Sequence, residues 1–430
     1  MSGRGPEGDV SLKIGEIIGA ERGDGSKPLE GIRILAIEQM QALPFATQLM
    51  AQMGATVVKV EHPVRGDSGR GSQPTVHDVD GREVGATYLR NALCKKSIAI
   101  DLKNPKGRAL IEALVPHYDV VGENFKPGTM QRLGLDYERL SALHPGLVYV
   151  SVSGFGNRGD SPYASWPAYA SIAEAMAGFY EVRREPGEYP RIGPSGALGD
   201  IGSSLFATIG ILAALRHRDA TGLGQHVDVS MFDAMVAMAD IVPFFWSMGV
   251  FARKGRRFGV VDVFRASDGF FIAQAVRDHQ LELLAHTVGH PEWLEDERLA
   301  ERAGWSEHMD ELVRPAIEAW AADKTMLEAC TELTSRGVAA GPCFSPEHVV
   351  HDPHVRAHDM LIEVPRPDAP DPLLVVGNPI KMSRTPEGPI ERWPTLGQHT
   401  EEVLRSDLGL DDADLSALRA SGAIGAADTA

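Results

Sequence analysis

An alternation of short β-type runs with helical runs starts at Gly31 and occupies the first half of the sequence. Residues 32–37 and 56–60 are apolar or β-branched, and residues 45–53 between them have helical spacing that stops at Gly54. A helical run at 106–115 and strand-like runs at 119–121 and 147–153 follow. Strand–helix–strand units of this kind build parallel sheets covered by helices. The pattern therefore predicts an α/β fold with a parallel sheet.

The clearest helical pattern covers residues 201–218 and places Asp200 at or just before a helix N-terminus. Free backbone N–H groups and the helix dipole stabilise a carboxylate at such a position. Gly196 and Gly199 allow a ligand to approach the backbone closely. On spacing alone, a plain helix cap is the commoner use of such an aspartate. The pattern thus leaves two interpretations open, a structural cap and an anionic functional group.

The character of the sequence changes after residue 251. Residues 260–275 predict a β-hairpin, and residues 280–336 are mostly helical and acidic. These features predict a smaller second α+β domain at about 252–342. Residues 1–27 are rich in Gly, Glu and Asp, and we expect a flexible tail there.

Charge and cysteine content limit the class of protein. The formal net charge of −17 argues against a broad basic face for nucleic acid. Three widely separated cysteines, Cys94, Cys330 and Cys343, predict neither a disulfide framework nor a CxxC metal site. The N-terminus lacks an apolar signal segment, and the longer apolar runs are short or contain acidic residues. We expect a cytoplasmic protein without nucleic-acid or membrane partners.

Two local motifs suggest chemistry that their surroundings do not support. Residues 154–159 match GxGxxG after a strand, but residues 160–162 continue a loop where a dinucleotide-binding helix should open. A tight glycine-rich turn is the better interpretation. His351, His354 and His358 lie close in sequence, but Pro353 interrupts the helical spacing that a metal site there would need. We predict no metal site.

Many ordered blocks between Pro28 and about Leu418 resemble one known family. The blocks are Pro28–Ile34, Pro44–Gln48, Met53–Ala55, Val58–Glu61, Lys96–Ile98, Asp101–Lys103, Glu123–Phe125, Pro127–Gly128, Arg132–Gly134, Gly199–Asp200, Gly210–Leu215, Gly222–Asp228, Gly341–Pro342, His351–Pro353 and Gly397–Thr400. They are similar to the class III CoA-transferases, the CaiB/BaiF family that includes formyl-CoA and carnitine CoA-transferases.

The resemblance implies a Rossmann-like large domain whose first part is 28–230 and whose C-terminal return is 343–430, with a linker at 231–251 and the small domain at 252–342 between them. It also implies an interlocked homodimer, and transfer of CoA from an acyl-CoA to a free carboxylic acid. The family's aspartate nucleophile corresponds to Asp200, and Gly199 and the first turn after Asp200 are candidate oxyanion donors. CoA and acyl-CoA are substrates, and no tightly bound cofactor is implied. The implied CoA contacts are Gln41, His62, Lys103, Asn124, Phe125 and Arg132. His62 stands where relatives often carry arginine, which weakens that assignment.

Two other functions remain open at this point. The first is an α-methylacyl-CoA racemase or another acyl-CoA isomerase on the same fold. The racemases pair the aspartate with a histidine, but Tyr169 occupies the matching position here and tyrosine has a pKa near ~10. A non-catalytic acyl-CoA binding protein is the second alternative. Tyr169 and Trp166 are candidates for lining an acyl pocket, with core packing an equal explanation. Residues 251–264 lack the glycine run of the formyl-CoA:oxalate enzymes, so oxalate specificity is not expected.

Overall fold

The computed structural model describes residues 12–19, 25–181, 187–193, 196–240, 242–249 and 259–425. The chain forms two compact units. The larger comprises Met1–Val182, Tyr189–Ile241 and Pro353–Ala430, and the smaller comprises Arg183–Glu188 and Val242–Asp352. Parts of the predicted tail (1–11 and 20–24), of the predicted linker (241 and 250–251) and of the stretch compared with the oxalate enzymes (251–258) lie outside the described residues.

A six-stranded sheet forms the centre of the larger unit, and all its neighbouring strands are parallel. Its spatial order is β6 (Lys95–Ala99), β3 (Thr56–Glu61), β2 (Arg33–Ile37), β7 (Val120–Glu123), β8 (Val148–Ser153) and β9 (His226–Ser230). Numbered along the chain, this is the order 3-2-1-4-5-6 of a doubly wound dinucleotide-binding fold. The predicted α/β fold with a parallel sheet is confirmed.

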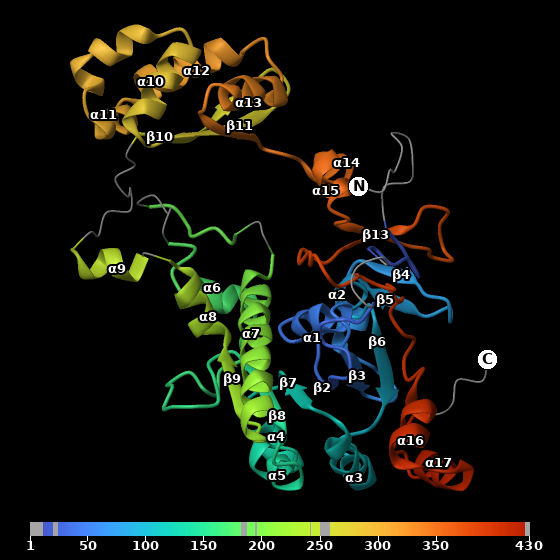
Figure 1. Cartoon of the computed structure of the whole chain (residues 1–430). Coiled ribbons are helices and arrows are strands. Elements are labelled where there is room, and N and C mark those ends of the chain that lie inside the picture. The colour runs from blue at the N-terminus through green and yellow to red at the C-terminus, as the bar shows by residue number, and fades with distance from the viewer. Residues whose placement is uncertain are drawn as a thin grey trace. The chain divides into compact units, whose positions relative to one another are not determined.

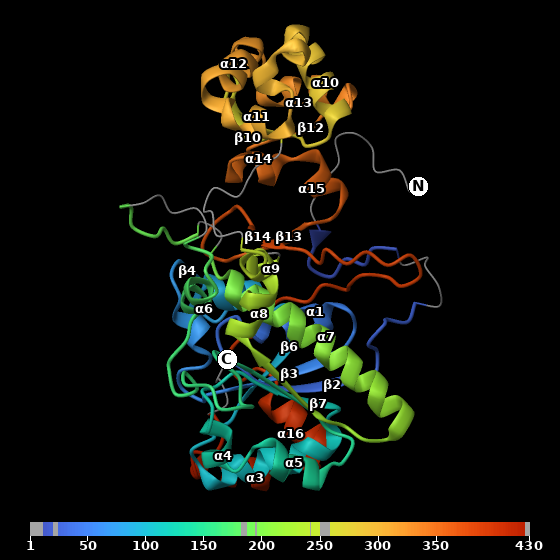
Figure 2. The same ribbon diagram turned by 90° about the vertical axis from the view of Figure 1, so that its left-hand side faces the viewer.

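Helices cover both faces of the sheet (Figures 1 and 2). Successive strand residues point to opposite sides, so apolar strands present side chains on both faces that must be buried. Ile34 and Ala36 of β2 face one core, and Leu35 and Ile37 face the other. The first core is covered by α1 (Pro44–Gln52), α6 (Ala170–Met176), α7 (Leu198–Thr221) and α8 (Met231–Met238). The second is covered by α3 (Pro105–Leu114), α4 (Thr129–Leu133), α5 (Tyr137–Leu143), α16 (Thr400–Leu408) and α17 (Asp412–Ala420).

Helix α7 begins at Leu198, three residues before the predicted start, so Asp200 lies inside its first turn. Its length and apolar composition would allow it to cross a membrane, and no other described helix has both properties. Half of its most apolar 18-residue stretch is buried in this structure, as expected for a helix packed on a sheet. Leu205, Ile209 and Leu212 are exposed along one side of it.

Segments from both ends of the chain complete the larger unit. Strand β1 (Leu12–Lys13) pairs in parallel with β13 (Leu361–Val364), which pairs with β14 (Leu373–Val376). Leu12 is buried. This part of the predicted flexible tail is therefore packed, because an apolar residue there has a partner strand. Val84 and Tyr88 share a core with Leu12; Val84 is in β5 (Glu83–Gly85), which pairs with β4 (Thr75–His77), and Tyr88 is in α2 (Ala86–Asn91). Helix α15 (Pro353–Ala357) precedes β13 along the chain.

The segment predicted as a linker contains two helices, α8 and α9 (Val242–Ser247). The Ser230 hydroxyl caps α8 by accepting the Asp233 N–H, and Met231 and Met235 of α8 are buried in the first core. A cap followed by apolar residues at helical spacing is a helix start signal, which explains why α8 is packed and does not behave as a linker.

The smaller unit combines a three-stranded antiparallel sheet with helices. The predicted hairpin is confirmed as β10 (Val260–Arg265) and β11 (Phe270–Ala275), and β12 (Ala339–Pro342) pairs with β11. Its own core includes Phe264, Trp293, Trp305 and Ile317. Besides α9, the α-helices of this unit are α10 (Asp278–Thr287), α11 (Arg302–Glu307), α12 (Arg314–Ala321), α13 (Met326–Ser335) and α14 (Pro346–His351).

Candidate active site

A cavity of about 530 Å³ opens at the carboxyl ends of β2, β3, β6 and β7. It is lined by Ile37, Gln39, Val60, Glu61, His62, Arg65, Gly66, Ser68, Ile100, Asp101, Leu102, Lys103, Phe125, Thr129, Arg132 and Leu133. The strand order reverses between β2 and β7, and doubly wound folds bind ligands beside such a switch point. The cavity therefore lies where this topology favours a ligand.

Four of the six residues expected to contact CoA line this cavity: His62, Lys103, Phe125 and Arg132. Asn124 stands behind it and fixes the loop after β2, because its amide accepts from the Gln39 N–H and donates to the Gln39 carbonyl, both at 2.8 Å. Gln41 does not line the cavity. The carbonyl of the next residue, Ala42, accepts from the Ser204 hydroxyl on α7 at 2.5 Å, so the loop joins the cavity to the helix that carries Asp200.

His62 serves as a turn acceptor. Its Nδ1 accepts the backbone N–H groups of Val64 and Arg65 at 3.1 and 3.3 Å, which requires the tautomer with the ring proton on Nε2. In that form the ring is an uncharged donor toward a ligand. The positive charge at the cavity comes instead from Lys103, Arg132 and Arg65.

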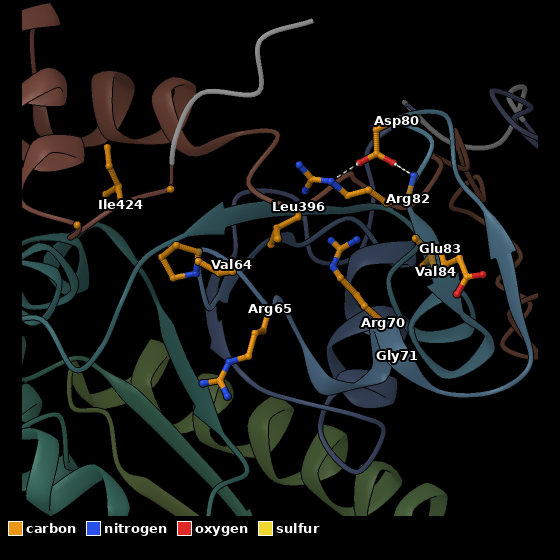
Figure 3. Close-up of a pocket in the computed structure, with 13 residues that line it drawn as sticks. Val64, Arg65, Arg70, Gly71, Asp80, Arg82, Glu83, Val84, Leu396 and Ile424 are labelled. Carbon is orange, nitrogen blue, oxygen red and sulfur yellow. Dashed lines mark hydrogen bonds and ion pairs between the residues drawn. The ribbon is translucent and has the colours of Figure 1, made fainter.

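Sequence reasoning missed Arg65. It lines both the first cavity and a second one of about 620 Å³, whose lining also includes Arg70, Arg82 and Leu396. Figure 3 shows the Arg65 side chain extending away from Arg70 and Arg82, while Arg82 turns to Asp80. A lone arginine three residues after His62 was the only available signal, and sequence alone does not distinguish it from surface charge.

A buried network of charged groups supports the floor of the first cavity. Arg70 donates to both oxygens of Glu61, at 2.7 and 2.8 Å, and the Ser97 hydroxyl donates to Glu61 as well. Burial alone would raise the pKa of Glu61, but the Arg70 guanidinium, together with Lys59, holds it at about 2. Glu61 is thus a permanently ionised, fully satisfied structural carboxylate.

The same network fixes the loop between β2 and α1. Lys59 pairs with Asp67 at 2.7 Å, and Asp67 Oδ1 accepts the Met40 N–H at 2.9 Å. Met40 has a φ of 60°, a conformation that non-glycine residues rarely adopt and that neighbouring contacts must hold. Asp67 thereby sets the path of the chain into Gln41 and toward α7.

Asp200 lies in the first turn of α7, next to Gly199. The Gly199 N–H already donates to the buried carboxylate of Glu174 at 3.0 Å. It is therefore occupied in this structure, contrary to the expected oxyanion role. The glycine is needed for packing, because a Cβ at this position would lie 2.9 Å from the Cα of Ala170 on α6.

The Asp200 carboxylate is unusual because it is partly buried without a hydrogen-bond or ion-pair partner among the described residues. No described residue donates a hydrogen bond to it or forms an ion pair with it. Burial, and secondly the charge of Glu174, raise the pKa of Asp200 to about 6. Above this pH the group is a poorly solvated anion. Such a carboxylate is available for nucleophilic attack, because no donor in the described part of the chain competes for its electrons.

Tyr169 and Trp166 are exposed to 71% and 50%, so core packing does not account for either side chain. Tyr169 is the N-cap residue of α6 and precedes Ala170, which touches Gly199. Trp166 packs edge-on against Phe155. Neither lines the two cavities described above, and their role in an acyl pocket stays a prediction.

Comparison with known proteins identifies the class. Residues 29–400 match the model of CoA-transferase family III. The chain is 37% identical to the succinyl-CoA–D-citramalate CoA-transferase of Chloroflexus aurantiacus, covering 92% of this chain and 97% of the relative. It is 34% identical to the succinate–glutarate CoA-transferase of Agrobacterium fabrum, covering 88% and 95%.

The solved structures agree with these relatives. A CaiB/BaiF family protein from Brucella suis superposes with a TM-score of 0.77 at 30% identity, covering 89% of this chain and 99% of that chain. The chain therefore belongs to CoA-transferase family III, and it is an enzyme of this class. The resemblance drawn from the ordered sequence blocks is confirmed.

Proposed function

We propose that the enzyme transfers CoA from succinyl-CoA to a small dicarboxylic acid, and that Asp200 carries the exchange. The observation that supports this most directly is the Asp200 carboxylate itself, partly buried and without a donor among the described residues. The choice of donor and acceptor follows the named activities of the relatives, which act on succinyl-CoA with citramalate or mesaconate or exchange succinate and glutarate.

The proposed reaction divides one exchange into four attacks. An oxygen of Asp200 attacks the thioester carbonyl and releases CoA thiolate, which leaves a mixed anhydride. The thiolate attacks the aspartyl carbonyl, which releases succinate and forms an aspartyl-CoA thioester. The acceptor carboxylate attacks this thioester and releases the thiolate again. The thiolate then attacks the acceptor's carbonyl, which yields the new acyl-CoA and restores the Asp200 carboxylate.

The first cavity is the proposed CoA site. Lys103, Arg132 and Arg65 would bind its phosphates, because these three cations line the cavity. Of the two carboxylates in the lining, Glu61 is paired with Arg70, and Asp101 accepts the backbone N–H of Lys103. Phe125 and Leu133 offer apolar contacts for the rest of the molecule. The loop from Gln39 to Gln41 then leads from this cavity toward α7, where the thioester must arrive.

We also propose that the enzyme works as an interlocked homodimer in the cytoplasm, with CoA as a substrate and no tightly held cofactor. Leu205, Ile209 and Leu212 of α7 support an association between chains, because they expose an apolar strip at i, i+4 and i+7. Light scattering after gel filtration would reveal the assembly, and a monomer at micromolar concentration would contradict it.

Intact-mass measurement after mixing with succinyl-CoA tests the mechanism. A CoA-sized adduct should form, map to Asp200 and be discharged by the acceptor acid. Arg65→Gln and Arg132→Gln should each raise the KM for succinyl-CoA by roughly 10-fold, and less at high salt. Arg82→Gln, on the second cavity, is the matched control. Absence of any adduct, with deuterium exchange at the acyl α-carbon, would favour a racemase instead.

A further inference from the structure

The first turn of α7 is held from outside its own helix. Its N-cap residue, Ala197, has a φ of 62° and offers no side-chain cap. The first N–H groups of a helix normally need an acceptor. Here Glu174 of α6 supplies one, because its Oε1 accepts the Gly199 N–H at 3.0 Å. Glu174 therefore does the work of an N-cap for the helix that carries Asp200.

Glu174 is itself held firmly. It is 6% exposed, and its second oxygen, Oε2, accepts the Tyr180 hydroxyl at 2.5 Å. Helix α6 packs against α7 (Figure 1), and Gly199 permits the close approach because it has no Cβ to meet the Ala170 backbone. Both carboxylate oxygens are thus bonded, and the carboxylate cannot move without breaking one of these contacts.

The charge of Glu174 opposes the effect that a helix N-terminus usually has on an anion. After burial, Glu174 is the second cause that raises the pKa of Asp200. The other elements packed on α7 are α1, α8, β8 and β9. Helix α1 carries no ionisable side chain. The ionisable residues of the other three elements do not contribute to the shift in the pKa of Asp200; they are Asp233 on α8, Tyr149 on β8, and His226 and Asp228 on β9.

We propose that Glu174 is a positioning residue for the Asp200 nucleophile: it fixes the first turn of α7 and keeps a negative charge beside Asp200. The proposal rests on the function proposed above. A more basic carboxylate is a better nucleophile, and a neighbouring charge makes Asp200 more basic without blocking its oxygens. Glu174 forms no bond to substrate and transfers no proton in this scheme.

The substitution Glu174→Gln separates charge from geometry, because a glutamine amide can still accept from Gly199. We expect its kcat near pH 8 to fall by roughly 3- to 10-fold, with the KM for succinyl-CoA nearly unchanged. The acid limb of the kcat/KM profile should move to lower pH by about half a unit to one unit. At pH 5 the variant would then retain a larger share of its own plateau than the wild type.

Two further variants measure how much of the effect comes from the hydrogen bonds of Glu174 rather than from its charge. Tyr180→Phe removes the hydroxyl but leaves the charge of Glu174, so its acid limb should stay at the wild-type position. Glu174→Ala removes both the charge and the acceptor for Gly199, and should lose more activity than Glu174→Gln. Melting curves of all three variants show whether the fold is kept.

The proposal is overturned if Glu174→Gln keeps both the wild-type kcat and the wild-type acid limb. It is also overturned if kcat falls equally in Glu174→Gln and Glu174→Ala with no change in the acid limb. If Glu174→Gln fails to fold, the pH dependence of adduct formation in the wild type is the test instead. An acid limb near pH 4 rather than pH 6 would contradict the charge effect. Failure of the proposed function is separate, since the wild type would then form no adduct on Asp200.

Discussion

A buried carboxylate, Glu61, and a partly buried one, Asp200, have opposite surroundings. Glu61, at the end of β3, has Arg70, Ser97 and Lys59 around it, and its pKa is held at about 2. Asp200, on α7, has no donor among the described residues, and its pKa is raised to about 6. The difference shows how burial can be used in two ways. A fully bonded carboxylate organises a site, whereas an unbonded one is left available for chemistry.

The largest expected effect is the loss of reaction when Asp200 is changed. Asp200→Asn should lower kcat by at least about 10⁴-fold, because the amide cannot form the covalent intermediate. Binding of CoA should change little, since Asp200 does not line the CoA cavity. Steady-state kinetics and equilibrium binding measure the two effects.

The control for this prediction lies on the same helix. Asp219 is 61% exposed on its side chain and close to Arg218, near the other end of α7. Asp219→Asn should leave kcat unchanged. If Asp200→Asn keeps a kcat within tenfold of the wild type, Asp200 is not the nucleophile. The contrast between a structural Glu61 and a reactive Asp200 would then be lost.

The next effect concerns stability at Glu61. Glu61→Gln should lower the free energy of unfolding by about 3–5 kcal/mol, because Arg70 would keep a buried charge without its carboxylate. Urea denaturation measures the difference, and Glu112→Gln, at an exposed pair with Arg139, should cost less than about 1 kcal/mol. A loss that small at Glu61 would show that the network is dispensable.

The pH dependence has a defined sign. Because the pKa of Glu61 is lowered from 4.5 to about 2, its stabilising effect is fully present above pH 4.5 and is lost as the pH falls toward 2. The difference between the wild type and Glu61→Gln should shrink over that interval.

The smallest effect is a gain in stability at Asp200. A folded-state pKa raised from 3.8 to about 6 means that the folded chain holds its proton longer than the unfolded chain. Stability therefore falls as the pH rises from about 3.8 through 6. Asp200→Asn should be more stable than the wild type by about 1–2 kcal/mol at pH 8, after allowance for partial solvent exposure, and equally stable at pH 3.5. Equal stability at both pH values would remove the contrast with Glu61.

Sequence reasoning predicted the elements that depend on local pattern. Strands β2, β3, β7 and β8 and the 260–275 hairpin follow from apolar and β-branched runs, and the family follows from ordered blocks spread over the chain. Strand β6 was not predicted as a strand. Asp200 came from its position before an apolar helix, although α7 starts at Leu198. The start was missed because Glu174, distant in sequence, supplies the cap that Ala197 lacks.

The remaining features depend on contacts between distant residues. Arg65 is an ordinary surface charge in the sequence, whereas Lys103 was assigned to CoA through the family resemblance, and the sheet brings both to one cavity. The sequence assigns His62 to CoA contact but does not show that its Nδ1 accepts two backbone N–H groups. The engaged N–H of Gly199 is likewise invisible without α6.

The pairing of β1 with β13 has a consequence for synthesis on the ribosome. Leu12 pairs with Ile362, and Ile100 forms an isolated β-bridge with Ile424. Segments that are synthesised early therefore pair only after segments near the C-terminal end have been synthesised. The six-stranded sheet is complete once Ser230 has emerged, and the smaller unit can form next because it has a core of its own. The early strands and the second face of the sheet stay incompletely covered until translation ends. A chain truncated before residue 361 would leave these surfaces open to aggregation or proteolysis, although every residue of the proposed site had already been made.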